Sequence, residues 1–499
     1  MRAADSPENC KLKEAVTLLL KGGYTLSSEA FELLRTTSDP VRSVNALLKK
    51  LKHCEPARTV IDKQTVAFTC VELENQSCKK KPNRSTTQVT LGGEATWSFL
   101  RPFSIEESHQ YTHGLHLYPA KMVPQMAREL IAKLSDPLDV VLDPFCGSGG
   151  VLVEALVANR NSIGTDINVL ALLLARVKTT PISTQKIRRT MRSVINEARR
   201  KTTEPLEPNL KLAMEKIPNL YHWFKPYVAK DLQILRSEIR DITDKELRDF
   251  FSVCFSAAMY DCSNIRKSDN PYFIRIWHKE ELAQHKPNVL ERFTRVVRRN
   301  ANAIESLSKA RKREAWAKTF KASAQELVPT VGRGTADLIV TSPPYGEERN
   351  TMDYTRFSKL SLYWLDLDQQ DIQKMRERAL GASPRRWQEA DMPSKTLTAK
   401  LSEVVAKNER RADEVYSFFH DYLICLKQMF DTLKEDGYCC IIIGDRTANR
   451  ISIPNGRITS ELCENIGYVV IEMLERKMFM RTLRSSVIGS ENVLIMKRA

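Results

Sequence analysis

The sequence lacks the long apolar runs of a membrane protein, because no stretch approaches the ~20 residues that a spanning helix needs. Its amino terminus is polar and charged, unlike a secretory signal peptide. The 11 cysteines are scattered, with no CxxC pair and no His/Cys cluster at zinc spacing. We therefore expect a cytoplasmic protein in a reducing environment, without a bound metal and without a membrane partner.

Negative charge is also scarce relative to positive charge. Lys and Arg number 77 against 61 Asp and Glu, which gives a formal net charge of +16 and a pI of about 9.3. This imbalance suggests a polyanionic partner, and a basic but inert surface is the alternative. At 499 residues the chain exceeds one ordinary hydrophobic core, so we expect two or three folded domains.

A strand, a glycine loop and a helix are predicted in the first third of the chain. The apolar run 139–142 leads into Asp143–Gly150, and helical spacing continues to about Asn159. Glycines let the backbone approach a ligand, and a helix amino terminus offers free N–H groups. The loop is neither the GxGxxG nor the GxxxxGK pattern. A second strand, 161–165, ends at Asp166, where an acid suits the two hydroxyls of a ribose.

A third apolar run, 336–340, predicts a buried parallel strand that ends in Thr341–Ser342–Pro343–Pro344–Tyr345. The prolines stiffen the backbone and remove two N–H donors. Carbonyl oxygens and the Ser342 hydroxyl then remain as acceptors, and Tyr345 adds an aromatic face. Such a socket fits a planar ring with an exocyclic amine, as in adenine or cytosine. A rigid turn after a core strand is the alternative interpretation of this stretch alone.

Taken in order, DPFCGSGG, GTDIN and TSPPYG resemble motifs of the S-adenosylmethionine-dependent amino-methyltransferases, which act on cytosine N4 or adenine N6. The run HLYPAKMVP at 116–124 is similar to the segment that packs on the methionine end of the cofactor in that family. The resemblance covers roughly residues 100–180 and 320–499. Ser342, in place of Asp or Asn, resembles the cytosine-N4 branch, as do four residues that follow it: Arg349, Asp353, Tyr354 and Arg356.

The resemblance implies an α/β fold of the Rossmann-like methyltransferase type, with a doubly wound, mainly parallel sheet and a carboxyl-terminal antiparallel hairpin. It implies S-adenosylmethionine as the cofactor and site-specific methylation of cytosine N4 in DNA. The expected catalytic residues are Ser342, Pro343, Pro344 and Tyr345. The expected cofactor-binding residues are Tyr118, Pro119, Lys121, Asp143, Phe145, Gly147, Gly149 and Asp166.

Three alternatives stay open: cytosine-N4 methylation of structured RNA such as ribosomal RNA, adenine-N6 methylation of DNA, and a non-catalytic nucleic-acid-binding module. A cognate restriction endonuclease is a candidate partner. One departure from the family concerns the cofactor adenine, because no Asp follows the third strand. Ser323 or Gln325 stands in that region.

The expected organisation is a small helical module at 1–75, a linker at 76–94, and a methyltransferase domain at 95–183 and 319–499. The basic helical insertion at 184–318 separates its halves. This insertion holds 29 Lys and Arg against 17 Asp and Glu, which suits nucleic acid. The expected phosphate contacts are Arg188, Arg189, Arg192, Arg311 and Lys312. Six aromatic residues either stack on bases or form the insertion's own core: Tyr221, Trp223, Phe224, Tyr272, Phe273 and Trp277.

Overall fold

The computed structural model describes residues 25–26, 44, 60–61, 97–100, 107–119, 121–266, 275–346, 354–388, 392–477 and 490–499. The chain divides into two compact units, Met1–Ala95 and Thr96–Ala499. In the first unit, β1 (Thr25–Leu26) pairs in parallel with β2 (Val60–Ile61), and Val44 is helical and buried. The helices expected elsewhere in 1–75 lie outside the described residues, as does the linker 76–94.

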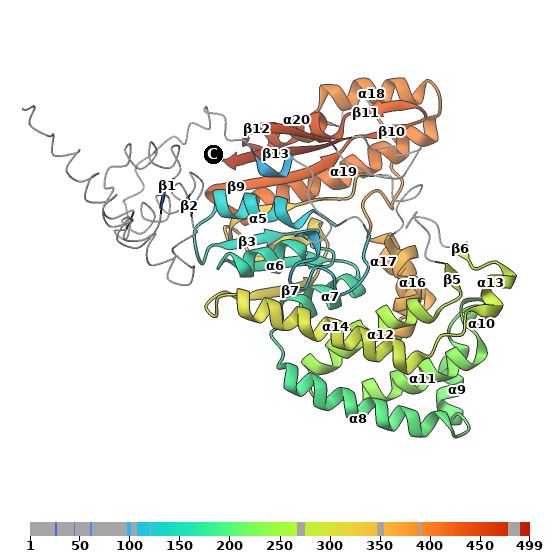
Figure 1. Ribbon diagram of the computed structural model, residues 1–499. Helices are drawn as coiled ribbons and strands as arrows, with labels where there is room; N and C mark the ends of the chain where they lie inside the picture. Colours follow the sequence, from blue (N-terminus) through green and yellow to red (C-terminus); the bar gives the residue numbers. More distant parts are fainter. Residues whose placement is uncertain are drawn as a thin grey trace, which may run out of the picture. The chain divides into compact units, whose positions relative to one another are not determined.

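The second unit is built on a sheet of seven strands in the order β12-β13-β9-β8-β3-β4-β7 (Figure 1). All neighbouring strands run parallel, except that β13 is antiparallel to both β9 and β12. This is the expected doubly wound sheet with its terminal antiparallel hairpin, so the predicted fold class is confirmed. The strands are β3 (Val140–Asp143), β4 (Asn161–Asp166), β7 (Ala317–Lys321), β8 (Ala336–Thr341), β9 (Leu433–Gly444), β12 (Tyr468–Lys477) and β13 (Ser490–Arg498).

Both faces of the sheet are buried, and successive side chains alternate between two cores. Val141, Leu338 and Val340 pack with α5 (Pro124–Leu134) and α6 (Gly150–Val157). Leu142 and Ile339 face the opposite core, with helices from the carboxyl-terminal half. This alternation follows from the two-residue period of a strand. The second core is covered by α18 (Lys395–Val405), α19 (Glu409–Thr432) and α20 (Asn455–Ile466).

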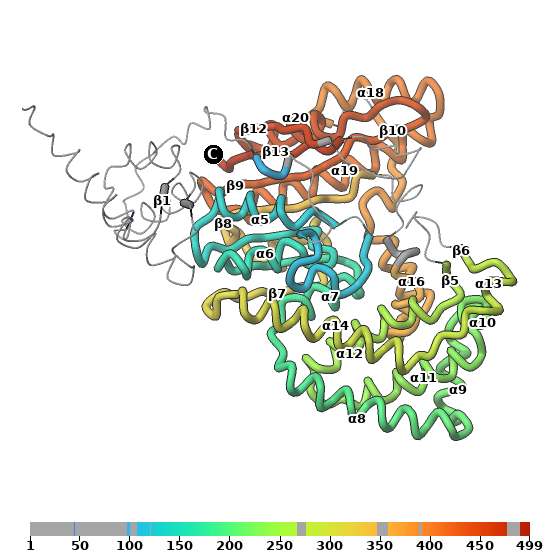
Figure 2. Tube along the Cα trace, viewed as in Figure 1, coloured from blue at the N-terminus to red at the C-terminus, as the bar shows by residue number. Residues whose placement is uncertain are grey.

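The helix α7 (Val169–Thr179) belongs to two cores at once. Leu172 and Ala175 pack in the core that α5 and α6 share with the sheet. Leu173, Leu174 and Val177, on the other side of the same helix, pack among helices of the insertion. The insertion is therefore joined to the sheet through α7, as the ribbon and the tube also show (Figures 1 and 2).

The insertion between β4 and β7 is mostly helical. Its longest helices are amphipathic: α8 has a serine cap at Ser183 and buries Ile187, Met191 and Val194 on one face. The strand β7 begins at Ala317, two residues before the boundary expected at 319. The elements are α8 (Thr184–Thr202), α9 (Pro208–Glu215), α10 (Leu220–Trp223), α11 (Pro226–Arg240), α12 (Lys245–Cys262), β5 (Ile265–Arg266), β6 (Arg275–Ile276), α13 (Lys279–Gln284) and α14 (Val289–Ala310).

The insertion's aromatic residues divide between core and surface. Phe224 is fully buried and packs edge-on against Trp364, with ring centroids 5.8 Å apart, so it is a core residue. Trp223 is partly buried against the same core, whereas Tyr221 is 64% exposed. Trp277 stacks on His285. Tyr272 and Phe273 lie outside the described residues.

The remaining elements connect these layers. Among the described residues, no helix is long and apolar enough to cross a membrane. The connecting elements are η3 (Ser98–Leu100), η4 (Glu107–His109), η5 (Ala324–Glu326), α15 (Leu327–Val331), α16 (Tyr354–Trp364), α17 (Gln369–Glu377), β10 (Arg446–Ala448) and β11 (Ile451–Ile453).

Candidate active site at the carboxyl edge of the sheet

The candidate site lies where β3 and β8 end side by side. The two strands pair in parallel, with Val141 opposite Leu338. From β3 the chain continues to β4 and β7 on one side, whereas β8 leads to β9 on the other. In open α/β sheets, ligands bind outside the carboxyl ends of the strands at such a switch point. Because Asp143 ends β3 and Ser342 follows β8, the two predicted motifs meet there.

A hydrogen bond joins the two motifs directly. The hydroxyl of Thr341, the last residue of β8, donates to Asp143 Oδ1 at 2.7 Å. The backbone N–H of Phe145 donates to the same oxygen at 3.2 Å. Burial nevertheless raises the pKa of Asp143 to about 7. Among the described residues this carboxyl group forms no ion pair, so a cationic ligand would stabilise its charged form.

Two glycines with positive φ shape the loop between β3 and α6. Gly147 has φ +47° and Gly149 has φ +79°. A Cβ on Gly147 would lie 3.4 Å from the ring of Tyr118, and a Cβ on Gly149 would lie 2.8 Å from Cα of Ala175 in α7. The loop is thus confined between the Tyr118 segment and α7. Phe145 is partly buried against the core of the α18–α20 face.

The segment expected at the methionine end of the cofactor does lie against this loop. Tyr118 is buried, and the side-chain amide of Asn168 donates to its hydroxyl at 3.4 Å. Lys121 Nζ donates to the carbonyl of His113 at 3.3 Å. Pro119, between them, is half-buried.

Asp166 ends β4 on the opposite side of the loop. Its Oδ2 accepts from the N–H of Gly147 at 2.9 Å, and its Oδ1 accepts from the N–H of Asn168 at 2.7 Å. Burial raises the pKa of Asp166 to about 6. A carboxylate has about four lone-pair sites, so beyond these contacts Asp166 can still accept a hydrogen bond from a hydroxyl of a diol.

The predicted catalytic segment continues directly from β8. Pro343 is buried and Pro344 is half-buried, while the Ser342 hydroxyl lies 3.3 Å from the hydroxyl of Tyr345. Tyr345 Oη donates to Glu491 Oε1 of β13 at 3.1 Å. The side-chain amide of Asn455, at the start of α20, donates to the Tyr345 carbonyl at 3.0 Å. Both ends of the tyrosine are therefore fixed.

Comparison with known proteins identifies the family. Residues 45–175 match the N6/N4 methylase family, described as DNA methylase. The Type II methyltransferase M.MvaI of Kocuria varians is 31% identical over 369 residues, which cover 71% of this chain and 81% of that protein. The chain belongs to the N4/N6 amino-methyltransferase family.

A second relative of this methyltransferase is the Type II methyltransferase M.MjaII of Methanocaldococcus jannaschii. It is 30% identical over 117 residues, which cover 23% of this chain and 22% of that protein. Among solved structures, TrmN from Thermus thermophilus aligns at 11% identity over 76% of this chain and 50% of that chain, with a TM-score of 0.27. So low a score carries no argument.

The site of this methyltransferase contains a buried lysine that the sequence did not indicate. Lys178, near the end of α7, is fully buried, and its Nζ donates to the hydroxyl of Ser148 in the glycine loop at 2.9 Å. Among the described residues it forms no ion pair with a carboxylate. Burial, together with the nearby charge of Lys121, lowers the pKa of Lys178 well below its usual value.

A series of hydrogen-bonded polar side chains connects the segment 116–124 to the helices α12 and α16. His116 Nε2 lies 2.8 Å from the hydroxyl of Ser256 in α12, and that hydroxyl lies 2.7 Å from the hydroxyl of Ser361 in α16. Burial lowers the pKa of His116 to about 4, so the imidazole is neutral at physiological pH. We therefore assign His116 to positioning the segment.

The expected phosphate contacts differ in their surroundings. Arg188, Arg189 and Arg192 are exposed on α8, and Lys312 is exposed beyond α14. Arg311 is half-buried, and its guanidinium donates to the carbonyls of Ala315 at 2.7 Å and Thr179 at 3.4 Å.

Three further observations complete the site. Arg349 and Asp353 lie outside the described residues, while Tyr354 and Arg356 belong to α16. Ser323, two residues after β7 and the N-cap of η5, is buried and accepts from the N–H of Gln325 at 3.3 Å. Over the part of the chain that the structure describes, no group of His, Cys, Asp and Glu is placed to hold a metal ion.

Proposed function

We propose that this methyltransferase transfers a methyl group from S-adenosylmethionine to the exocyclic N4 amine of cytosine at a specific sequence in DNA. The observation that carries the proposal is the hydrogen bond between Thr341 and Asp143, which places an acceptor-rich strand end beside a glycine loop. The similarity to two Type II methyltransferases and to the DNA methylase family supports DNA as the substrate.

The residues around the glycine loop fit the proposed cofactor. Asp143 and Asp166 have pKa values raised by burial, and among the described residues neither forms an ion pair. Two such carboxyl groups suit a ligand that brings a positive charge and a diol. Gly147 and Gly149 expose the backbone of the loop at two positions, and Tyr118 lies against Gly147. When bound, S-adenosylmethionine supplies an activated methyl group at this site.

The segment after β8 fits an exocyclic amine. An aromatic amine is a weak nucleophile, because its lone pair is delocalised into the ring. The Ser342 hydroxyl and the Pro343 carbonyl can accept the two amine hydrogens, which localises the lone pair. The ring of Tyr345 can stack on the base, and its fixed position limits the orientations that the base adopts. Holding the amine in line with the methyl group supplies much of the rate.

The proposed reaction proceeds without a covalent enzyme intermediate. Cys146 is the thiol in the glycine loop, and it is buried. Burial and the negative charges of Asp166 and Asp143 raise its pKa well above the usual value. A thiol that stays protonated is a poor nucleophile. Direct transfer to the amine therefore agrees with the chemistry of the site.

The DNA is proposed to reach the site with its target base turned out of the helix, because an exocyclic amine inside a stacked duplex is inaccessible to the loop. Arg188, Arg189, Arg192 and Lys312 are the proposed backbone contacts. Arg311 is a weaker candidate for a phosphate contact, because its guanidinium already donates to two backbone carbonyls. A cognate restriction endonuclease and a cytoplasmic location stay predictions.

Nucleoside mass spectrometry of DNA and RNA from cells with and without the protein tests the proposal. We expect N4-methylcytosine in DNA with the wild type and its loss with Ser342→Ala, although S-adenosylmethionine affinity measured by calorimetry stays unchanged. The matched control is Ser402→Ala, an exposed serine of α18 whose hydroxyl donates to the carbonyl of Thr398.

The other outcomes are distinct. N6-methyladenine without N4-methylcytosine would assign the enzyme to adenine. N4-methylcytosine in RNA alone would assign it to RNA. Methylation of a ring carbon would contradict the proposed chemistry altogether.

A further inference from the structure

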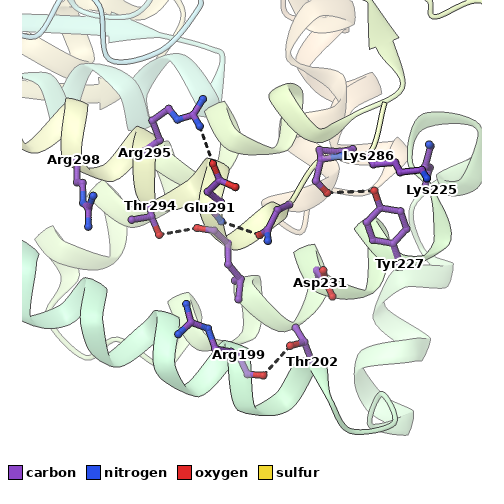
Figure 3. Close-up of a pocket in the computed structure, with 13 residues that line it drawn as sticks. Arg199, Thr202, Lys225, Tyr227, Asp231, Lys286, Glu291, Thr294, Arg295 and Arg298 are labelled. Atoms are coloured by element: carbon purple, nitrogen blue, oxygen red, sulfur yellow. Dashed lines mark hydrogen bonds and ion pairs between the residues drawn. The ribbon is translucent and has the colours of Figure 1, made fainter. Parts of the chain in front are cut away.

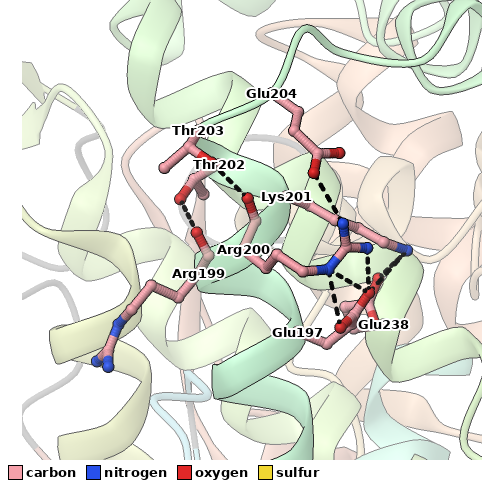
Figure 4. Close-up of polar contacts among 8 residues, drawn as sticks. All are labelled: Glu197, Arg199, Arg200, Lys201, Thr202, Thr203, Glu204 and Glu238. Atoms are coloured by element: carbon pink, nitrogen blue, oxygen red, sulfur yellow. Dashed lines mark hydrogen bonds and ion pairs between the residues drawn. The ribbon is translucent and has the colours of Figure 1, made fainter.

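Neighbouring cations on α8 have opposite surroundings. Arg200 forms ion pairs with Glu197 at 2.6 Å and with Glu204 at 2.7 Å, and Lys201 pairs with Glu238 at 2.7 Å (Figure 4). Arg199, one position earlier, points away from this group and, among the described residues, forms no ion pair. The side of α8 that carries Arg200 is therefore neutralised, and the side that carries Arg199 keeps its charge.

Arg199 faces a cleft of about 1050 Å³ between α8, α11 and α14 (Figure 3). Arg298, across the cleft on α14, likewise has no ion pair among the described residues, whereas Arg295 pairs with Glu291 at 2.9 Å. The charged residues of the lining are five cations and two carboxylates, a difference of +3: Arg199, Lys225, Lys286, Arg295 and Arg298 against Asp231 and Glu291.

The backbone around the cleft adds to this positive potential. The helices α11 and α14 both begin there, since Lys225 and Asn288 are their N-cap residues and also line the cleft. The amino terminus of a helix carries partial positive charge and favours anions. Lys225 Nζ donates to the carbonyl of His285 at 2.6 Å, which leaves two of its three hydrogens for another acceptor.

The face of α8 that carries Arg199 continues toward residues already proposed to bind phosphate. Arg188, Arg192 and Arg199 are four and seven residues apart, so at 100° per residue they lie within about 40° of one another on the helix surface. They extend over about 16 Å of its length. A row of this length spans several phosphates of a duplex, whose charges are separated by about 1.7 Å along the axis.

We propose that this cleft, with Arg199 and Arg298 as its unpaired cations, holds the phosphate backbone of the DNA substrate. This inference rests on the proposed function, because it takes DNA as the substrate. The lining carries five cations, whereas pockets that enclose small ligands are lined mostly by hydrophobic and aromatic side chains. Contacts to phosphates orient a duplex without reading its sequence, so this cleft supplies affinity and orientation, and base recognition belongs elsewhere.

Fluorescence anisotropy with a labelled 30-base-pair duplex of mixed sequence, titrated at several salt concentrations, tests the cleft. Each phosphate contact contributes about −0.9 to the slope of log affinity against log salt. The double variant Arg199→Gln/Arg298→Gln should therefore make the slope about 1.8 shallower. Arg199→Lys, which keeps the charge, should keep most of the affinity.

Arg200→Gln is the matched control, because it removes one positive charge from the adjacent position together with its ion pairs to Glu197 and Glu204. If net charge alone governed binding, Arg200→Gln would weaken affinity at least as much as Arg199→Gln. We expect the single variant Arg199→Gln to weaken binding and Arg200→Gln to leave the slope unchanged. Equal effects of the two, or an unchanged slope in the double variant, would overturn the inference.

Methylation of the same DNA by the wild type separates this inference from the proposed function. If the wild type methylates DNA while the double variant binds it normally, the cleft assignment fails and the function stands. If the protein methylates no DNA but binds an RNA hairpin through Arg199 and Arg298, the DNA assignment fails and the cleft stands as a polynucleotide site. If the wild type binds neither nucleic acid, both fail.

Discussion

Replacing Gly149 with alanine should lower the free energy of unfolding by about 2–5 kcal/mol. The φ of +79° is a left-handed conformation that costs a residue with a Cβ roughly 1–2 kcal/mol. The new Cβ would also lie 2.8 Å from both Cα and Cβ of Ala175 in α7, and relieving such an overlap within packed helices costs roughly 1–3 kcal/mol. Because the obstacle includes backbone, a change of rotamer cannot remove it.

Gly150 provides a control at the adjacent position. It is the first residue of α6, and a Cβ there would meet no heavy atom within 4 Å. Alanine in a helix is favoured over glycine by roughly 0.5–1 kcal/mol, so Gly150→Ala should stabilise the protein slightly. Urea denaturation of the wild type and both variants measures the difference. Equal stability of the two variants, or a more stable Gly149→Ala, would show that the loop is not confined by α7 as described.

Four more predictions concern the site. Asp166→Ala should weaken S-adenosylmethionine binding by about 1–3 kcal/mol through a lost hydrogen bond, and calorimetry showing unchanged affinity would contradict the ribose assignment. Tyr345→Ala should lose a stacking contact of about 1–3 kcal/mol with the base, measured as DNA affinity at saturating cofactor.

Burial raises the folded-state pKa of Asp143 from 3.8 to about 7, so the folded cofactor-free protein binds more protons than the unfolded chain between these values. Its stability should then fall as the pH rises from about 4 to about 7, and Asp143→Asn should flatten that decline in a pH series of urea denaturations. Lys178→Met should stabilise the protein at pH 7, because the folded-state pKa of Lys178 is lowered by burial, and the gain should shrink as the pH approaches 10.5. A gain that does not change with pH would point to packing instead of charge.

Features encoded by consecutive residues could be predicted from the sequence. The strand, glycine loop and helix around Asp143–Gly150 depend on local patterns of apolar residues and glycine, and the structure has them within one or two residues of the expected positions. The meeting of this loop with Ser342 follows from the parallel pairing of β3 and β8, because the carboxyl ends of neighbouring parallel strands lie at one edge.

Partners distant in the sequence could not be predicted. Glu491 and Asn455, which fix Tyr345, lie 146 and 110 residues after it. At such separations no sequence motif indicates that these residues are in contact. Lys178 has the position of an ordinary basic residue in the last turn of a helix, and only tertiary packing buries it. The burial of the insertion's aromatic residues also could not be predicted. Phe224 and Tyr221 are three positions apart, yet Phe224 is buried and Tyr221 is exposed.

The double use of α7 has a consequence for how this enzyme can evolve. An insertion that packed only on itself could be exchanged between relatives as a cassette. Here Leu173, Leu174 and Val177 belong to the insertion's core, while Leu172 and Ala175 of the same helix belong to the sheet's core. A recombinant with a foreign insertion would inherit a mismatched α7, next to the loop that α7 confines. We therefore expect this lineage to diverge by substitutions on the insertion's outer surface, with its helical scaffold inherited together with the sheet.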